Sequence, residues 1–149
     1  REVVLAAVAQ NGLVLHYASD ELRGDRDVVL AAIAMDGRAL QWASRQLLGD
    51  REVVLAAVTK NAYSLLHASD ELRGDRDVVM AAVTQDGSLL RYATGELRGD
   101  RTVVLAAVAQ SDAAMEHASP ALRQISEELL AEAQGIRSLG QTLGPKAAR

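Results

Sequence analysis

The sequence predicts an all-α fold, an α-solenoid of 25-residue repeats with three short helices in each repeat. Three observations lead to this prediction. The sequence matches itself at an offset of 25 residues, three positions of each repeat hold helix N-capping residues, and the core positions recur as small or aliphatic residues. Self-similarity at such a period is typical of a solenoid, because each repeat buries its apolar face only against its neighbours.

Five tandem repeats fill residues 1–125 and share one pattern. The first reads REVVLAAVAQNGLVLHYASDELRGD and the third reads REVVLAAVTKNAYSLLHASDELRGD. The repeats span residues 1–25, 26–50, 51–75, 76–100 and 101–125. We number the positions within each repeat from 1 to 25, so that position 12 of the second repeat is Gly37.

The first helix of each repeat is expected at positions 1–10. It follows an Asp at the last position of the preceding repeat, and this side chain can accept a hydrogen bond from a free N–H of the first turn. The capping residues are Asp25, Asp50, Asp75 and Asp100. Positions 3, 4, 5, 7 and 8 are apolar in all five repeats, so we expect them to form the stacked core together with positions 15 and 22.

The second and third helices are expected at positions 12–18 and 20–23, each after a capping residue. Position 11 is Asn, Asp or Ser, and position 19 is Ser or Thr. Pro120 directly follows Ser119, which suits the first residue of a helix. Position 12 is often Gly, but Ala62 and Asp112 also occupy it, which favours an N-cap over a turn that needs a positive φ angle.

Position 17 carries a flat ring in every repeat, and we expect each ring to pack within the rod. The five residues are Tyr17, Trp42, His67, Tyr92 and His117. His67 and His117 are two repeats apart, about 20 Å at the usual spacing of packed helices, so they cannot share a metal ion. The sequence predicts neither a metal site nor a cofactor site.

Every repeat begins with Arg, which an acidic residue usually follows, so stacking predicts a ladder of alternating charge along one edge. Each exposed pair is worth about 0–1 kcal/mol, and the ladder therefore contributes more to register than to stability. The tripeptide Arg23-Gly24-Asp25 arises where a helix-ending Gly meets the capping Asp. We interpret it as a helix junction and not as a ligand of adhesion receptors.

Composition argues against several classes of function. The net charge is −4 and each recurrent Arg is interleaved with acids, which leaves no basic stripe for nucleic acid. The longest apolar runs are far shorter than the roughly 18 to 20 residues of a membrane span. No phosphate loop, zinc-binding His pair or nucleophile elbow occurs in the sequence, so we expect no enzyme. The absence of Cys excludes disulfides but does not fix the compartment.

The pattern REVVLAAVxxxGxxLxxASxELRxD resembles the repeats of the family known as domain of unknown function (DUF) 4116, over residues 1–125. The Val-Val-Leu-Ala-Ala core, the Ala-Ser step and the Glu-Leu-Arg ending recur in this order. The family has no assigned activity and no catalytic residues to transfer. The resemblance therefore implies a scaffold without chemistry of its own.

Both ends of the solenoid are expected to differ from its middle. Residues 126–135 should form a degenerate sixth-repeat capping helix, in which Glu128 and Glu132 replace Val and Ala and end the rod in water. Residues 136–149 are expected to be a loose C-terminal tail, because Gly and Pro interrupt them. The chain opens with a full repeat and without a leader peptide. We therefore expect any targeting segment to be removed or never present, and further repeats or a partner to cover the open N-terminal face.

Positions 13 and 16 vary between repeats and lie three residues apart on one face of the second helix. One interpretation is sequence drift at solvent-exposed positions. The other is a binding surface for a protein partner centred on the third repeat, where Tyr63 and Leu66 lie side by side. The predicted contact residues are Leu13, His16, Arg38, Gln41, Tyr63, Leu66, Ser88 and Arg91.

The predicted function is a non-enzymatic helical-repeat scaffold that mediates protein–protein interaction, with a partner that the sequence does not identify. The alternative is a small structural or accessory subunit held in a larger assembly, for example in an organelle. Gel filtration separates the two, since a stable monomer favours the binding scaffold and an insoluble isolated chain favours the subunit.

Overall fold

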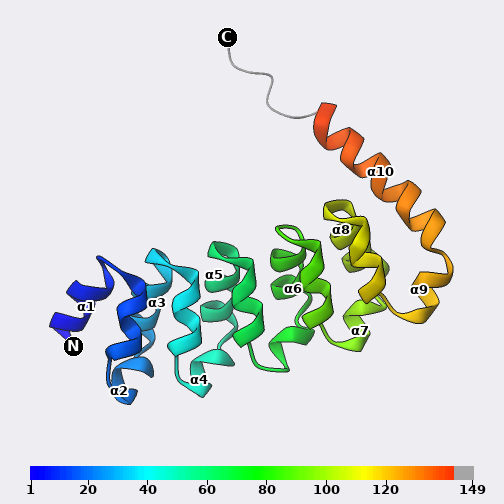
Figure 1. Ribbon diagram of the computed structural model, residues 1–149. Helices are drawn as coiled ribbons and strands as arrows, with labels where there is room; N and C mark the ends of the chain where they lie inside the picture. The colour runs from blue at the N-terminus through cyan, green and yellow to red at the C-terminus, as the bar shows by residue number, and fades with distance from the viewer. Residues whose placement is uncertain (143–149) are drawn as a thin grey trace, which may run out of the picture.

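The computed structural model describes residues 1–142, and successive repeats stack side by side into a rod (Figure 1). The described residues form helices and no strand, so the predicted all-α repeat fold is confirmed. The first helix of the chain lies at one end of the rod, and the last repeat lies at the other (Figure 1).

Each repeat contributes three helices, one to each of three rows. The first row consists of α1 (Glu2–Val8), α3 (Arg26–Met35), α5 (Arg51–Lys60), α6 (Arg76–Val83) and α8 (Arg101–Gln110). The second row consists of η1 (Gly12–Tyr17), η2 (Gly37–Trp42), η3 (Ala62–His67), η5 (Gly87–Tyr92) and η6 (Asp112–His117). The third row consists of α2 (Asp20–Arg23), α4 (Arg45–Leu48), η4 (Leu72–Gly74), α7 (Gly95–Arg98) and α9 (Pro120–Gln124). A longer helix, α10 (Ser126–Thr142), follows the fifth repeat.

The second-row helices are 3₁₀ helices, a type that the sequence alone did not specify. Their backbone bonds join residues three apart, as when the N–H of Val14 donates to the carbonyl of Asn11 at 3.2 Å. Short segments of six residues suit this geometry, which has three residues per turn. Positions 13 and 16 therefore lie one above the other more closely than they would on an α-helix.

Most of the predicted N-caps form. Asp25 accepts hydrogen bonds from the N–H groups of Asp27 and Val28, and Asn11 accepts one from Leu13 at 3.0 Å. In the described residues Thr94 and Ser111 occupy cap positions without making a side-chain cap bond. In the second repeat the three helices begin at Arg26, Gly37 and Arg45, each within one residue of its predicted start. The agreement is good because a capping residue marks each start.

Residues at position 19 also join neighbouring repeats through a backbone hydrogen bond. The N–H of Ser44 donates to the carbonyl of Arg23 at 2.9 Å, and the same bond recurs at each following junction. The other three pairs are Ser69 with Leu48, Thr94 with Arg73 and Ser119 with Arg98. One inter-repeat backbone bond per junction fixes the register of the third row.

Gly at position 12 serves a close approach between repeats. No described residue has a positive φ angle, which agrees with the expectation from Ala62 and Asp112. A Cβ atom on Gly12, Gly37 or Gly87 would lie only 2.0–2.6 Å from a carbonyl oxygen in the first helix of the next repeat. Gly is therefore required there because the two backbones touch.

The core consists of small aliphatic side chains from the first and second rows. Positions 3, 4, 7 and 8 are buried in the second to fifth repeats, and position 15 is buried throughout. Position 5 was predicted to be core but is only half-buried in four repeats, where it packs against the core. Position 14 was missed, although it is buried from the second repeat onward. One occupant is polar: Ser64 donates to the carbonyl of Gly37 at 2.9 Å.

The predicted charge ladder is present along the first row. Arg1 contacts Asp25 at 2.6 Å, which caps the first helix of the following repeat, and Asp27 at 3.0 Å within that helix. Arg26, Arg51 and Arg76 repeat this contact with the next capping Asp. The hydrogen bond from Arg1 lowers the pKa of Asp25 to about 2. The Asp of the Arg-Gly-Asp tripeptide is therefore engaged by a cap and by an ion pair.

Helix α10 packs on α8 and differs from the prediction in two ways (Figure 1). Glu128 and Glu132 are exposed, but they lie on the side of α10 that faces the fifth repeat, and both acids contact Arg101. The helix also continues to Thr142 rather than ending at residue 135, so the prediction of a loose segment is wrong for residues 136–142. Position 11 of this sixth unit is Ile136, which cannot cap a new helix. Residues 143–149 lie outside the described residues.

Candidate protein-interaction surface

Every aromatic and imidazole ring of the chain lies on the second-row 3₁₀ helices. The composition includes one Trp, three Tyr, three His and no Phe. The seven residues are His16, Tyr17, Trp42, Tyr63, His67, Tyr92 and His117. We call the exposed side of the second row, at positions 13, 16 and 17, the aromatic row. Its helices contact one another in sequence, from η1 to η6.

The 3₁₀ geometry separates buried from exposed positions in this row. Positions 12 and 15 are one turn apart and face the core in most repeats. Positions 13 and 16 are also one turn apart and carry the variable side chains outward. Tyr63 is 52% exposed and Leu66 is 39% exposed, although both are large and partly apolar. The predicted surface is thus one continuous face of the rod.

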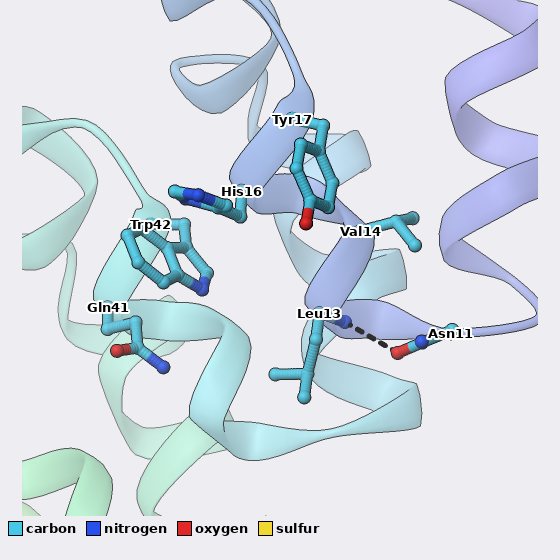
Figure 2. Close-up of a pocket in the computed structure, with 7 residues that line it drawn as sticks. All are labelled: Asn11, Leu13, Val14, His16, Tyr17, Gln41 and Trp42. Carbon is cyan, nitrogen blue, oxygen red and sulfur yellow. Dashed lines mark hydrogen bonds between the residues drawn. The ribbon is translucent and has the colours of Figure 1, made fainter.

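A groove lies between η1 and η2, and Figure 2 shows the residues that line it. They are Asn11, Leu13, Val14, His16, Tyr17, Gln41 and Trp42. The centroids of the His16 and Trp42 rings are 4.0 Å apart, and those of His16 and Tyr17 are 4.9 Å apart in an edge-on arrangement. The groove has a volume of about 340 Å³, which is at the lower end of the range for ligand sites.

A second groove lies between η2 and η3. Its lining residues are Arg38, Gln41, Tyr63, Ser64, Leu66 and His67. Tyr63 extends toward the fourth repeat, and its hydroxyl donates to Asp86 at 2.6 Å. This bond to a carboxylate raises the pKa of Tyr63 and lowers the pKa of Asp86. Arg38 pairs with Asp36 of its own repeat, so its charge is already partly compensated.

The structure brings most of the predicted contact residues together. Leu13, His16 and Gln41 line the η1–η2 groove, and Arg38, Gln41, Tyr63 and Leu66 line the η2–η3 groove. Gln41 belongs to both grooves and joins them. The remaining two residues lie farther along the row on η5, where Ser88 is half-buried and the guanidinium of Arg91 stacks 4.7 Å from the ring centroid of Tyr92.

Sequence reasoning missed Tyr17 and Trp42 as members of this surface. Their position was expected to hold packed rings, but Tyr17 is 85% exposed and Trp42 is half-buried. In the described residues no repeat stacks in front of Tyr17, and His67, at the same position of the third repeat, is exposed as well. The signal was present in the sequence, since nearly all the rings of the chain share two adjacent positions.

Among the described residues, no group of three His, Asp or Glu side chains could hold a metal ion. None of the helices in residues 1–142 has both the length and the apolar character needed to cross a membrane. The grooves present aromatic ring surface, side-chain amides and hydroxyl groups, which suit noncovalent recognition.

Comparison with known proteins identifies a family. The family model described as domain of unknown function (DUF4116) matches residues 1–48, 50–98 and 75–129, and each match covers about two of the 25-residue repeats. No curated protein and no solved structure matches the chain. Since the three matches together span the five repeats, the chain belongs to the DUF4116 family.

Proposed function

We propose that the protein is a non-enzymatic scaffold that binds a partner protein through the aromatic row. The single observation that carries this proposal is the placement of all seven rings on the helices of the second row. The core is filled by Ala, Val, Leu and a few similar residues, and Trp42 and Tyr92 pack against it only in part, so ring surface remains accessible. Tyr and Trp are common anchors of protein interfaces, because they bury a large area and lose little conformational entropy.

Charge supports a protein partner over nucleic acid. The arginines that open the first three repeats each contact the Asp that caps the next first-row helix, and the net charge is −4. Few basic side chains therefore remain free to neutralise phosphates. On the aromatic row, Arg38 is paired with Asp36, which reduces its value as a phosphate contact.

The experiment compares partner capture by the wild type and by Tyr63→Ala with Leu66→Ser. Both side chains are exposed, so we expect the double variant to keep its helical content in circular dichroism while losing the partner. The matched control is Ala113→Ser with Glu116→Gln, which changes the same two positions in the fifth repeat. Unchanged capture by the first variant would refute the proposal for the third repeat.

A second candidate function is that of an accessory subunit held in a larger assembly. It is favoured by the end face of the first repeat, where Val3 is 82% exposed and lines an apolar hollow with Val4, Ala7 and Tyr17. Such a hollow suits a permanent neighbour, which could be further repeats or another subunit. Gel filtration of the isolated chain separates the two functions, since the scaffold should be a stable monomer.

A further inference from the structure

Core positions lie open to solvent at the end face of the first repeat, where α1 ends the rod (Figure 1). Val3 is 82% exposed, whereas position 3 is fully buried in each of the four later repeats. Ala7 is exposed and Val14 is half-buried, although their positions are buried from the second repeat onward. The apolar hollow on this face is lined by Val3, Val4, Ala7, Val14, Tyr17 and Ala18. We call this surface the end face.

The four junctions inside the rod show what covers the equivalent face of a later repeat. At each junction, first-row and second-row helices of one repeat pack on those of the next. The covering repeat also supplies a carbonyl at position 23, which accepts from the N–H at position 19, as between Arg23 and Ser44 at 2.9 Å. At three junctions its Arg at position 1 contacts the acid at position 2, as between Arg1 and Asp27 at 3.0 Å. The covering surface therefore combines apolar area, a carbonyl and a guanidinium.

Glu2 and Ser19 on the first repeat hold the unused halves of these polar contacts. Within residues 1–142 the N–H of Ser19 has no backbone acceptor, although position 19 of every later repeat donates across a junction. Glu2 occupies the position of Asp27, Glu52 and Asp77, each of which pairs with an Arg of the preceding repeat. Glu2 is exposed and forms no ion pair in the part of the chain that the structure describes. The end face thus presents an apolar hollow, a free donor and a free acid together.

A second copy of this chain does not offer the matching surface. That surface is the far side of a last repeat, and here α10 packs on the fifth repeat, where Glu128 and Glu132 engage Arg101. The α10 unit is no substitute, because its position 1 is Ser126 and one helix runs on to Thr142, the last described residue. Two end faces placed together would each present an acid and an N–H donor, so neither would meet its counterpart.

We propose that the end face binds the uncapped last repeat of a second solenoid of this 25-residue type, which belongs to another subunit. The apolar positions of the two repeats meet as at an internal junction, the partner's position-23 carbonyl accepts from Ser19, and its position-1 Arg pairs with Glu2. The contact continues an interface that the chain already builds four times. The inference rests on the second candidate function, that of an accessory subunit, and specifies the chemistry of its neighbour.

The test pairs the full wild-type chain with a probe made from the same chain. The probe carries Leu129→Asp and Ala133→Asp, which charge the two buried residues of α10 and release this helix from the fifth repeat. It also carries Val3→Glu, so that it does not stack on itself. Sedimentation of the mixture should show a 1:1 complex with a Kd below about 0.1 mM, and each protein alone should be a monomer. The NMR signal of the Ser19 amide should shift in the labelled wild type.

A charge swap tests the register of the contact. Glu2→Arg in the otherwise wild-type chain should weaken binding at least about tenfold, because it places two guanidinium groups against each other. Arg101→Glu in the probe should then restore binding, since Arg101 is the position-1 Arg of the probe's last repeat. The matched control is Met35→Arg, at an exposed first-row position of the second repeat, which should bind the probe as the wild type does.

A folded probe that leaves the wild type monomeric at about 0.1 mM, or a charge swap that does not restore binding, would overturn the inference. Dimerisation of the wild type alone that Val3→Glu abolishes would also overturn it, because the occupant would then be a second copy. If the probe loses helical content in circular dichroism, a chain lengthened by a copy of residues 76–100 ahead of Arg1 replaces it. The added repeat should slow amide exchange at Ser19, and exchange as fast as in the wild type would overturn the inference.

The accessory-subunit function has a separate readout, which is capture of the native assembly by the wild type and by Val3→Glu. Loss of capture by Val3→Glu without any binding of the probe would refute the inferred occupant and leave that function standing. Probe binding with unchanged capture would support the end face as a docking site for a repeat and refute the accessory-subunit function. The two failures are therefore distinguishable.

Discussion

Replacing Gly87 with Ala should destabilise the rod by about 3 kcal/mol, the upper part of the range for overpacking a close contact. Gly87 is the buried first residue of η5. A Cβ atom there would lie 2.0 Å from the carbonyl oxygen of Ala107 and 2.9 Å from its carbonyl carbon. Both atoms belong to the backbone of α8, so no flexible side chain can move aside. The fourth and fifth repeats must separate or the last turn of α8 must change.

The third repeat indicates how such a change is accommodated. Its position 12 is Ala62, which is 5% exposed, and the helix that faces it, α6, has eight residues where α5 and α8 have ten. We therefore expect Gly87→Ala to shorten α8 at its C-terminal end. Thermal unfolding followed by circular dichroism should show Tm lower by roughly 6–12 °C, at about 2–4 °C per kcal/mol for a chain of this size.

Gly95→Ala is the control for the loss of a glycine as such. Gly95 is the first residue of α7, and a Cβ atom there would have no described atom within 4 Å. Alanine should stabilise the protein by about 0.4–1 kcal/mol, because it restricts the unfolded chain. If Gly87→Ala is as stable as the wild type while Gly95→Ala behaves as expected, the close-approach explanation of position 12 is wrong.

Three further predictions concern single contacts. Arg137→Ala removes the donor of the 2.7 Å hydrogen bond to the carbonyl of Ala109 and should lower the stability of the α10 contact by about 1–3 kcal/mol. Amide exchange should become faster in α10 and stay unchanged in α5. Exchange in α10 as slow as in the wild type would show that this contact does not hold the helix. Tyr63→Phe removes the hydroxyl bond to Asp86 and should raise the pKa of that carboxyl toward its usual value in an NMR titration, and an unmoved pKa would contradict the bond. The pKa of Asp25 is about 2 in the folded protein against 3.8 for the free group, so its stabilising effect is complete above pH 3.8 and is lost as the pH falls toward 2. Tm should therefore fall between pH 4 and pH 2, and a Tm that is constant over this interval would contradict the ladder.

Much of the fold could be predicted from the sequence because each helix start carries its own chemical signal. The caps at Asp25, Asp36 and Ser44 mark the starts of α3, η2 and α4, since a side chain that binds a free N–H acts locally and needs no knowledge of the tertiary fold. The same local logic explains the charge ladder. A repeat of 25 residues places each Arg beside the next capping Asp once the repeats stack.

The sequence could predict neither which side of a first-row helix faces the preceding repeat nor where α10 ends. The repeat pattern does not say which side of the first helix faces the preceding repeat, and so the contacts of Glu128 and Glu132 with Arg101 were not predicted. The continuation of α10 past Gly135 follows from the absence of a cap at Ile136, whereas Gly alone suggested an end.

The candidate site, too, could be predicted only in part. The exposure of positions 13 and 16 follows from their variation between repeats, and the structure places Tyr63 and Leu66 on the surface as expected. The grooves could not be predicted, because their shape depends on how the side chains of adjacent repeats meet. Tyr17 and Trp42 were therefore recognised as part of the surface only in the structure.

The central claim is that the aromatic row is the surface that binds the partner, and oxidative footprinting of the chain with and without the native partner tests it most directly. Tyr17, Trp42 and Tyr63 are reactive toward hydroxyl radicals and line the two grooves. Met35 is 47% exposed on the first row and serves as the internal control. We predict that the partner protects the three rings and leaves Met35 unchanged. Rings that stay fully reactive in the complex, with protection at Met35 instead, would contradict the claim.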